Sequence, residues 1–300
     1  MPSVAVVNQM ILEDYLEVWT QAFLTSKKSE NLTPQSIAFY KLNLGIFIDY
    51  CKSVSIKTVS QLTPVALREF FIYLGESHNA GGVHCAFRSV RAFLNWYWFE
   101  VEPEGKNPIS KVKAPKVPPV VIQGISREEF EKLLDVCDRG SFTGERDRTI
   151  LLLLMDTGIR AMELCRIKLD NVNLLENSIL IEQGKGRKPR TVFIGSTTRK
   201  QIRRYLKYRK ESNYLFTNRS GDSLGYVALR EIIRRVNVAA NVKGISPHDF
   251  RRGFCLASLQ AGVDLLTLSR LMGHTGLGLL SRYAQQSSSD LQAKFKSIVD

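Results

Sequence analysis

Apolar positions recur at helical spacing through the first hundred residues and predict a small all-helical module. Thr33-Pro34 and Thr63-Pro64 each place a capping hydroxyl before a proline suited to a first helical turn, so a helix is predicted to begin at each. A fourth helix is expected from about Gly82 to Glu100. The first helix carries an apolar stripe formed by Ile11, Leu12, Tyr15, Leu16, Trp19 and Phe23. Four such helices predict one bundle over residues 9–105.

Mixed helical and strand patterns follow over residues 123–300 and predict a second domain. Ser126-Arg127-Glu128-Glu129 has the form of a capping box and predicts a helix start. A buried helix is expected from Arg146 to Asp156, ending near Gly158, and further helices over 227–242, 249–261 and 265–272. Residues 178–181 and 191–194 are predicted to pair as strands around a Gly-Lys-Gly turn. The expected fold class is therefore mainly α with a small antiparallel β-sheet, the second domain being α+β.

Residues 106–122 are predicted to join the two domains. Four prolines prevent a continuous helix between Lys106 and Pro119, and four lysines favour water or an anionic partner. One interpretation is a basic strap in which Lys111, Lys113 and Lys116 contact a DNA backbone. The other is a plain solvated linker, and the sequence does not choose between them.

The net charge of +13 indicates a polyanionic partner, because each cation laid on a phosphate releases counterions. Charge alone does not distinguish DNA from RNA or an anionic membrane surface. No apolar stretch approaches the ~18 residues of a membrane span, and the amino terminus does not have the form of a secretion signal, so a cytoplasmic protein is expected.

Cysteine and histidine spacing disfavours a disulfide framework and a zinc site, because the five cysteines are far apart and the four histidines lack ligand spacing. No acidic cluster suits a two-metal nuclease either. We therefore expect neither a metal nor another cofactor.

Five residues carry groups suited to chemistry on a phosphodiester: Arg160, His248, Arg251, His274 and Tyr283. Two arginines can each hold a phosphate oxygen through a planar fork of donors, and their charge stabilises a five-coordinate phosphorus. A tyrosine phenol titrates near pH ~10 and becomes a good nucleophile only when a neighbour takes its proton. The two histidines are the obvious neighbours.

The predicted hairpin offers candidates for the general acid that protonates the departing sugar oxygen. Lys185 is the favoured candidate, and Arg187, Lys188 and Arg190 are its rivals and candidate DNA contacts. Glu163, three residues after Arg160, is expected to orient an arginine. His248 and Arg251 fall on one helical face, whereas Arg252 points about 100° away, toward DNA backbone or a carboxylate.

The order Arg160, Lys185, His248-x-x-Arg251, Gly273-His274 and Tyr283 resembles the tyrosine recombinase (phage integrase) family, in particular Xer-type and mobile-element integrases. The resemblance extends from about residue 10 to 300. It implies a SAM-like core-binding bundle followed by a catalytic domain. It also implies that Arg160 and Arg251 clamp the scissile phosphate, that Lys185 protonates the leaving 5′-oxygen, and that His248 is the general base. His274 would hydrogen-bond the phosphate, and Tyr283 would form the 3′-phosphotyrosyl bond.

The resemblance further implies a site-specific DNA recombinase acting on double-stranded DNA, as a tetramer on two duplexes, in integration, excision or resolution. Such an enzyme would be nucleoid-associated in a prokaryote or belong to a phage or mobile element. The tail from Ser287 to Asp300 would dock on a neighbouring protomer or on its own domain. Arg252 stands where many members have histidine, and residues 275–280 lack the usual Ser/Thr pattern, which leaves subfamily and target open. The alternatives are a type IB topoisomerase and an inactive DNA-binding protein.

Overall fold

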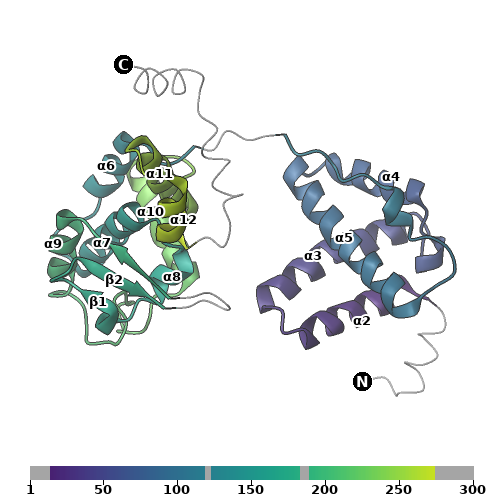
Figure 1. Cartoon of the computed structure of the whole chain (residues 1–300), viewed down its shortest axis with the longest axis horizontal. Helices are drawn as coiled ribbons and strands as arrows, with labels where there is room; N and C mark the ends of the chain where they lie inside the picture. The colour runs from purple at the N-terminus through teal and green to yellow at the C-terminus, as the bar shows by residue number, and fades with distance from the viewer. Residues whose placement is uncertain (1–13, 119–122, 183–188, 274–300) are drawn as a thin grey trace. The chain divides into compact units, whose positions relative to one another are not determined.

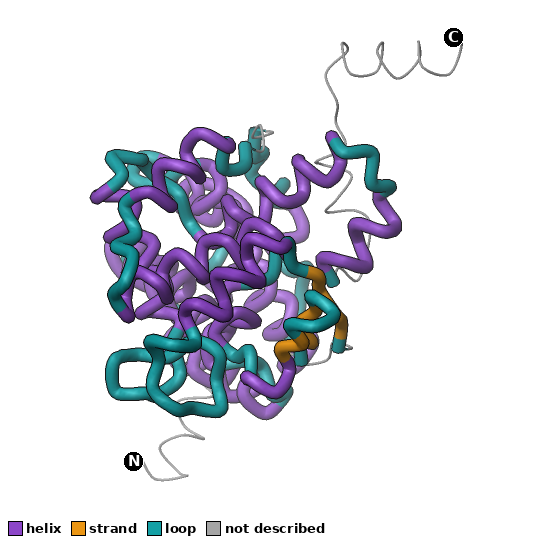
Figure 2. Tube along the Cα trace, turned by 90° about the vertical axis from the view of Figure 1, so that its left-hand side faces the viewer, coloured by secondary structure: helices purple, strands orange, loops and turns teal. Residues whose placement is uncertain are grey.

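The chain forms two compact units, residues 1–120 and 121–300, each with its own hydrophobic core. The structure, a computed structural model, describes residues 14–118, 123–182 and 189–273 (Figure 1). Helices dominate this described part of the chain, as the purple tube of Figure 2 shows, and its three strands all lie within residues 172–193 of the second unit. The predicted fold class, mainly helical with a small antiparallel sheet, is confirmed.

The first unit is a helical bundle centred on its longest helix. It contains α2 (Leu16–Ser29), α3 (Pro34–Ser53), α4 (Pro64–Gly75) and α5 (Ala80–Val101), with short 3-10 helices at Val59–Gln61 and Pro108–Lys111. α5 packs against the other three helices. Both predicted threonine caps are confirmed, since Thr33 Oγ1 accepts a hydrogen bond from Ser36 N at 3.2 Å and Thr63 Oγ1 from Ala66 N at 3.1 Å.

Part of the segment expected as a linker packs into this bundle. Ile109 and Val112 are buried in the core of the first unit. The three lysines of interest, Lys111, Lys113 and Lys116, remain exposed beside them. The chain from 108 to 116 is therefore anchored by its apolar residues and presents its lysines to solvent.

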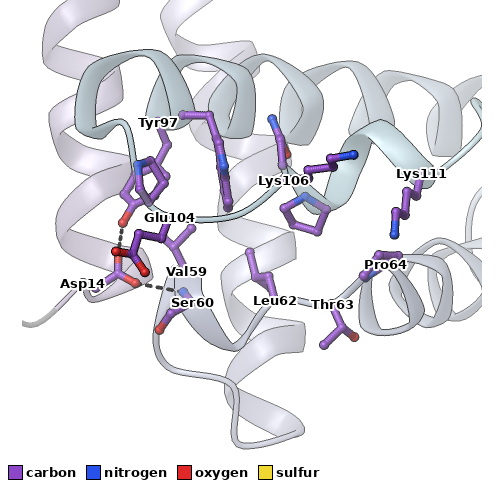
Figure 3. A pocket seen from close by; sticks show the side chains of 14 residues that line it. Asp14, Val59, Ser60, Leu62, Thr63, Pro64, Tyr97, Glu104, Lys106 and Lys111 are labelled. Atoms are coloured by element: carbon purple, nitrogen blue, oxygen red, sulfur yellow. Dashed lines mark hydrogen bonds between the residues drawn. The ribbon is translucent and has the colours of Figure 1, made fainter.

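A pocket in the first unit lies between the 3-10 helix Val59–Gln61 and the chain that follows α5 (Figure 3). At one end the Asp14 carboxylate accepts hydrogen bonds from the Tyr97 hydroxyl and from Ser60 N, the latter at 2.8 Å. Lys106 and Lys111 line the pocket farther along. Asp14 thus ties the chain before α2 to the end of α5.

The second unit surrounds one buried helix, α7 (Phe142–Thr157). Its run from Ile150 to Leu154 is entirely buried, and it packs against α9 and α11. Around it lie α6 (Arg127–Asp135), α8 (Ala161–Cys165), α9 (Ser196–Tyr205), α10 (Tyr226–Ala239), α11 (Pro247–Gln260) and α12 (Leu265–Met272). The capping box predicted at Ser126 is confirmed.

The sheet contains three short antiparallel strands in the order β1 (Val172–Asn173), β2 (Ser178–Ile181), β3 (Arg190–Phe193). Ile179 opposes Val192, and both are buried. β3 begins one residue before the predicted strand because Arg190 pairs with Ile181. A two-residue strand such as β1 leaves no alternating pattern to detect.

Two glycines allow segments of the second unit to pack at close range. Gly158 ends α7 at φ 56°, and a Cβ there would lie 2.5 Å from Phe254 Cδ1. A Cβ on Gly124 would lie 2.4 Å from the backbone nitrogen of Gly253, in α11. Neither position has room for a side chain.

None of the helices within residues 14–118, 123–182 and 189–273 has the length and apolarity that a bilayer crossing requires. The five cysteines carry free thiols, four of them buried.

Candidate active site

One pocket of the second unit is lined by three of the six predicted catalytic residues: Arg160, His248 and Arg251. Arg160 precedes α8, and the other two lie in the first turns of α11. These segments are far apart in sequence, and α7 and its terminal Gly158 bring them together. The remaining lining residues are Ile159, Ala161, Tyr226, Arg230, Ser246 and Pro247.

Arg160 is positioned by its own helix start. It caps α8 in an extended conformation, and its backbone N–H donates to Glu163 Oε2 at 2.9 Å. Its Nη1 donates to the other oxygen, Glu163 Oε1, also at 2.9 Å. The same carboxylate therefore fixes both the backbone and the guanidinium of Arg160, as the sequence predicted for Glu163.

α11 places His248 and Arg251 on the pocket wall. Ser246 caps the helix and donates from its backbone N–H to Asp249 Oδ2 at 2.8 Å, while Pro247 occupies the first turn. The three-residue step sets both side chains on one face, as predicted. Arg252 instead donates to Asp249 Oδ1 at 3.0 Å, the carboxylate option of the sequence prediction.

The Arg251 side chain is buried, with the residue only 3% exposed. Its guanidinium donates to two backbone carbonyl oxygens, Gly158 O and Met272 O, the latter at 2.9 Å. These bonds hold the guanidinium rigidly, and a rigid donor loses little entropy when it binds a phosphate.

His248 is exposed on the first turn of α11, although part of its ring is withdrawn from water. That partial burial, together with the positive charges of Arg252 and Arg251, lowers the pKa of the imidazole below its ordinary value. A lowered pKa keeps the ring neutral near pH 7, which is the form that can accept a proton.

The Arg190 side chain is held against Glu163. We expected it among the DNA contacts, but its Nη2 donates to Glu163 Oε2 at 2.7 Å and its Nη1 to Glu163 Oε1 at 3.1 Å. The side chain is only 14% exposed. The partner that draws it inward lies 27 residues earlier, and no local pattern signals this contact.

Glu163 is thus shared by two arginines. Burial alone would raise the pKa of its carboxyl, but the hydrogen bonds and charges of Arg190 and Arg160 outweigh that effect and lower the pKa to about 2. Glu163 is therefore ionised near neutral pH. Because Glu163 is paired with two guanidinium groups and Arg251 contacts backbone carbonyls instead, the site keeps a net positive charge.

This lowered pKa predicts an acid-sensitive contribution to stability. The contribution is complete above pH ~4.5 and is lost as the pH falls toward ~2, and it is worth roughly 3 kcal/mol. The free-energy difference between wild type and Glu163→Gln should therefore shrink as pH falls from 5 to 3. Denaturant titrations followed by circular dichroism measure it, with Glu128→Gln as control because that carboxylate is exposed. A difference independent of pH would contradict the prediction.

Lys185, His274 and Tyr283, the other predicted catalytic residues, lie outside the described residues, as do Arg187 and Lys188. Tyr226 and Arg230 were not predicted, although both line the pocket. They are four apart at the start of α10, so they share one face. The only signal in the sequence is that spacing, which is too common to have identified them.

The buried Arg251, the half-buried Arg160 and the imidazole of lowered pKa are groups suited to binding a phosphodiester. The model of the phage integrase family matches residues 123–289, more than half of the chain, and the chain belongs to this family. The tyrosine recombinase XerC of Oceanobacillus iheyensis is 27% identical over 95% of this chain and 95% of its own length. The protein is a tyrosine-type site-specific recombinase, an enzyme of DNA recombination.

Solved structures share the fold. The Tn1549 transposon integrase in complex with transposon right end DNA aligns with a TM-score of 0.78 and 16% identity, over 95% of this chain and 100% of that one. A lambda integrase tetramer bound to a Holliday junction aligns with a TM-score of 0.73 and 13% identity, over 90% of this chain and 77% of that one.

Proposed function

We propose that the protein cleaves and rejoins DNA at a specific site through a covalent 3′-phosphotyrosyl intermediate formed by Tyr283. The observation that carries this proposal is the single pocket lined by Arg160, His248 and Arg251 in a member of this family. A phosphodiester bound there would meet two fixed guanidinium groups and a neutral imidazole.

The two arginines supply the electrostatic part of the reaction. In the transition state the phosphorus gains a fifth oxygen and its equatorial oxygens gain negative charge. Arg160 and Arg251 would stabilise that charge, and their contacts with Glu163, Gly158 and Met272 hold them in place beforehand. His274 would donate a further hydrogen bond to the phosphate.

The bonds and protons balance without a cofactor. The Tyr283 oxygen attacks the phosphorus while its proton passes to His248, and the bond to the 5′-oxygen breaks as Lys185 gives that oxygen a proton. A free 5′-hydroxyl of a partner strand then attacks the phosphotyrosine and releases Tyr283. The energy of the phosphodiester bond is kept throughout.

DNA contacts and assembly complete the proposal. Lys111, Lys113 and Lys116 are exposed and suit contacts with DNA backbone. We propose residues 9–105 as the core-binding domain, 106–122 as the connector and 123–300 as the catalytic domain, with Arg187 and Lys188 as further phosphate contacts. The tetrameric lambda integrase neighbour supports four protomers on two duplexes here. Such an enzyme would be associated with the nucleoid.

Trapping the covalent intermediate tests the function. Duplexes selected for binding from a randomised library are nicked close to the cleaved bond, so that the short fragment bearing the freed 5′-hydroxyl diffuses away. Denaturing electrophoresis should then show a protein–DNA adduct, and un-nicked duplexes should join only when both carry the selected site. Absence of any adduct would refute the proposal. Relaxation of supercoiled DNA irrespective of sequence would favour a topoisomerase instead.

Arg230 is expected to contact a DNA phosphate next to the scissile one. It lines the pocket, is exposed, and has no ion pair within the residues described. Replacement by glutamine should weaken binding of all duplexes and reduce the salt slope of log Kd by about one. Fluorescence anisotropy over a salt series measures this. Arg127→Gln is the matched control, because Arg127 is exposed but pairs with Glu131 away from the pocket, and an equal change in both variants would contradict the assignment.

A further inference from the structure

Three arginines hold three consecutive carbonyl oxygens at the C-terminal end of α12. Arg190 Nε donates to Leu271 O at 3.1 Å, Arg251 Nη2 to Met272 O at 2.9 Å, and Arg160 Nη2 to Gly273 O at 3.4 Å. The last carbonyls of a helix have no partner within the helix and carry its negative dipole end, so cations stabilise them. The three arginines come from β3, from α11 and from the residue that precedes α8.

Two of these arginines are the phosphate ligands of the proposed function, and Arg190 is the third. It faces the same carboxylate as Arg160, taking Glu163 Oε2 at 2.7 Å and sharing Oε1 at 3.1 Å. It also lies directly against Gly273, where an added Cβ would be 2.9 Å from its Nη1. Arg190 therefore joins α8 to the end of α12 through one rigid group.

We infer that Arg190 is a positioning residue for strand cleavage and does not bind DNA. The inference rests on the proposed function, because it concerns how Arg160 is prepared for the phosphate. With Arg190 present, Glu163 divides its charge between two guanidinium groups. Without it, Glu163 would neutralise Arg160 alone, and the end of α12 would lose one of its three donors.

A lysine cannot substitute for Arg190. The side chain donates at once to both oxygens of a carboxylate and, from the third nitrogen, to a carbonyl on another element. An ammonium is a point charge without this fixed fork. Displacement of a reacting group by about 1 Å costs on the order of 100-fold in rate.

The test compares Arg190→Met and Arg190→Lys with Arg235→Met. Arg235 is the matched control because its Nη2 donates to the buried carboxylate of Asp147 at 2.6 Å and it does not line the pocket. Each variant is assayed for melting temperature, DNA affinity with its salt slope, and cleavage rate at saturating nicked duplex. Cleavage is repeated on a duplex whose scissile phosphate is replaced by a methylphosphonate, which removes the negative charge that Arg160 faces.

Both Arg190 variants should bind DNA with an unchanged salt slope and cleave roughly 100-fold more slowly. On the neutral methylphosphonate the ratio of wild-type to variant rate should shrink by about tenfold, because less positive charge is then needed. Arg235→Met should lose stability without this substrate dependence. Arg190→Lys keeps the charge and most of the stem, so it provides a folded variant if Arg190→Met does not fold.

Three results would overturn the inference. A salt slope lowered by about one would make Arg190 a DNA contact. Cleavage at the wild-type rate would remove any role, and an equal defect on both substrates would make the role structural only. Absence of an adduct from the wild-type protein would instead refute the proposed function, and this inference with it.

Discussion

Tyr283→Phe is expected to abolish the covalent protein–DNA adduct while leaving DNA affinity unchanged. The substitution removes one oxygen atom, and that oxygen is the proposed nucleophile. The aromatic ring is kept, and unchanged DNA affinity would show that the loss of adduct is not due to misfolding. Denaturing electrophoresis on nicked duplex measures the adduct, and anisotropy measures binding.

Tyr226→Phe is the matched control, because the structure places the Tyr226 side chain in the lining of the pocket. This variant should still form the adduct, and peptide mapping of the trapped wild-type protein should find the DNA on Tyr283. The reverse outcome, an adduct retained by Tyr283→Phe and lost from Tyr226→Phe, would transfer the nucleophilic role to Tyr226.

Arg251→Lys is expected to reduce cleavage at saturating DNA by about 10²–10³-fold, the usual effect of losing a fixed donor to a developing charge. The guanidinium also occupies two buried carbonyl oxygens, Gly158 O and Met272 O, which a lysine cannot reach together. Leaving one of them unsatisfied should lower the free energy of unfolding by roughly 2 kcal/mol. Single-turnover cleavage and denaturant titration measure the two effects separately.

Arg252→Lys controls for the charge and the helix. Arg252 is the next residue on α11, its side chain is 37% exposed, and it pairs with Asp249. Its replacement should alter cleavage and stability only slightly. Equal losses in both variants would show that the defect belongs to α11 as a whole rather than to the Arg251 guanidinium.

Local signals in the sequence predicted most of the helical framework. Threonine and serine caps identified the starts of α3, α4 and α6, and Gly158 identified the end of α7. Sequence reasoning did not single out α9, whose exposed face is crowded with basic residues and whose apolar positions are few. A cap is a contact within four residues of the chain, so it can be predicted without knowing the fold.

Spacing alone predicted which side chains lie together only where the residues share a helix. His248 and Arg251 are three apart, so their common face follows from helical geometry alone. Arg190 was predicted only as a DNA contact. Its ion pair with Glu163 could not be predicted, because it depends on how β3 packs against α8. Tyr226 was not predicted for a similar reason: its place in the pocket depends on contacts between α10 and α8, which cannot be inferred from either segment alone.

The close approach of Gly124 to Gly253 bears on how chimeric recombinases can be built. The two backbones leave no space for a methyl group, and Ile125 N donates to Asp249 O at 3.3 Å beside them. The first residues of the second unit are therefore sterically complementary to the α11 of this protein. A hybrid that exchanges DNA-recognition modules between relatives should place its splice point ahead of Gly124, so that this segment and α11 are inherited from the same parent.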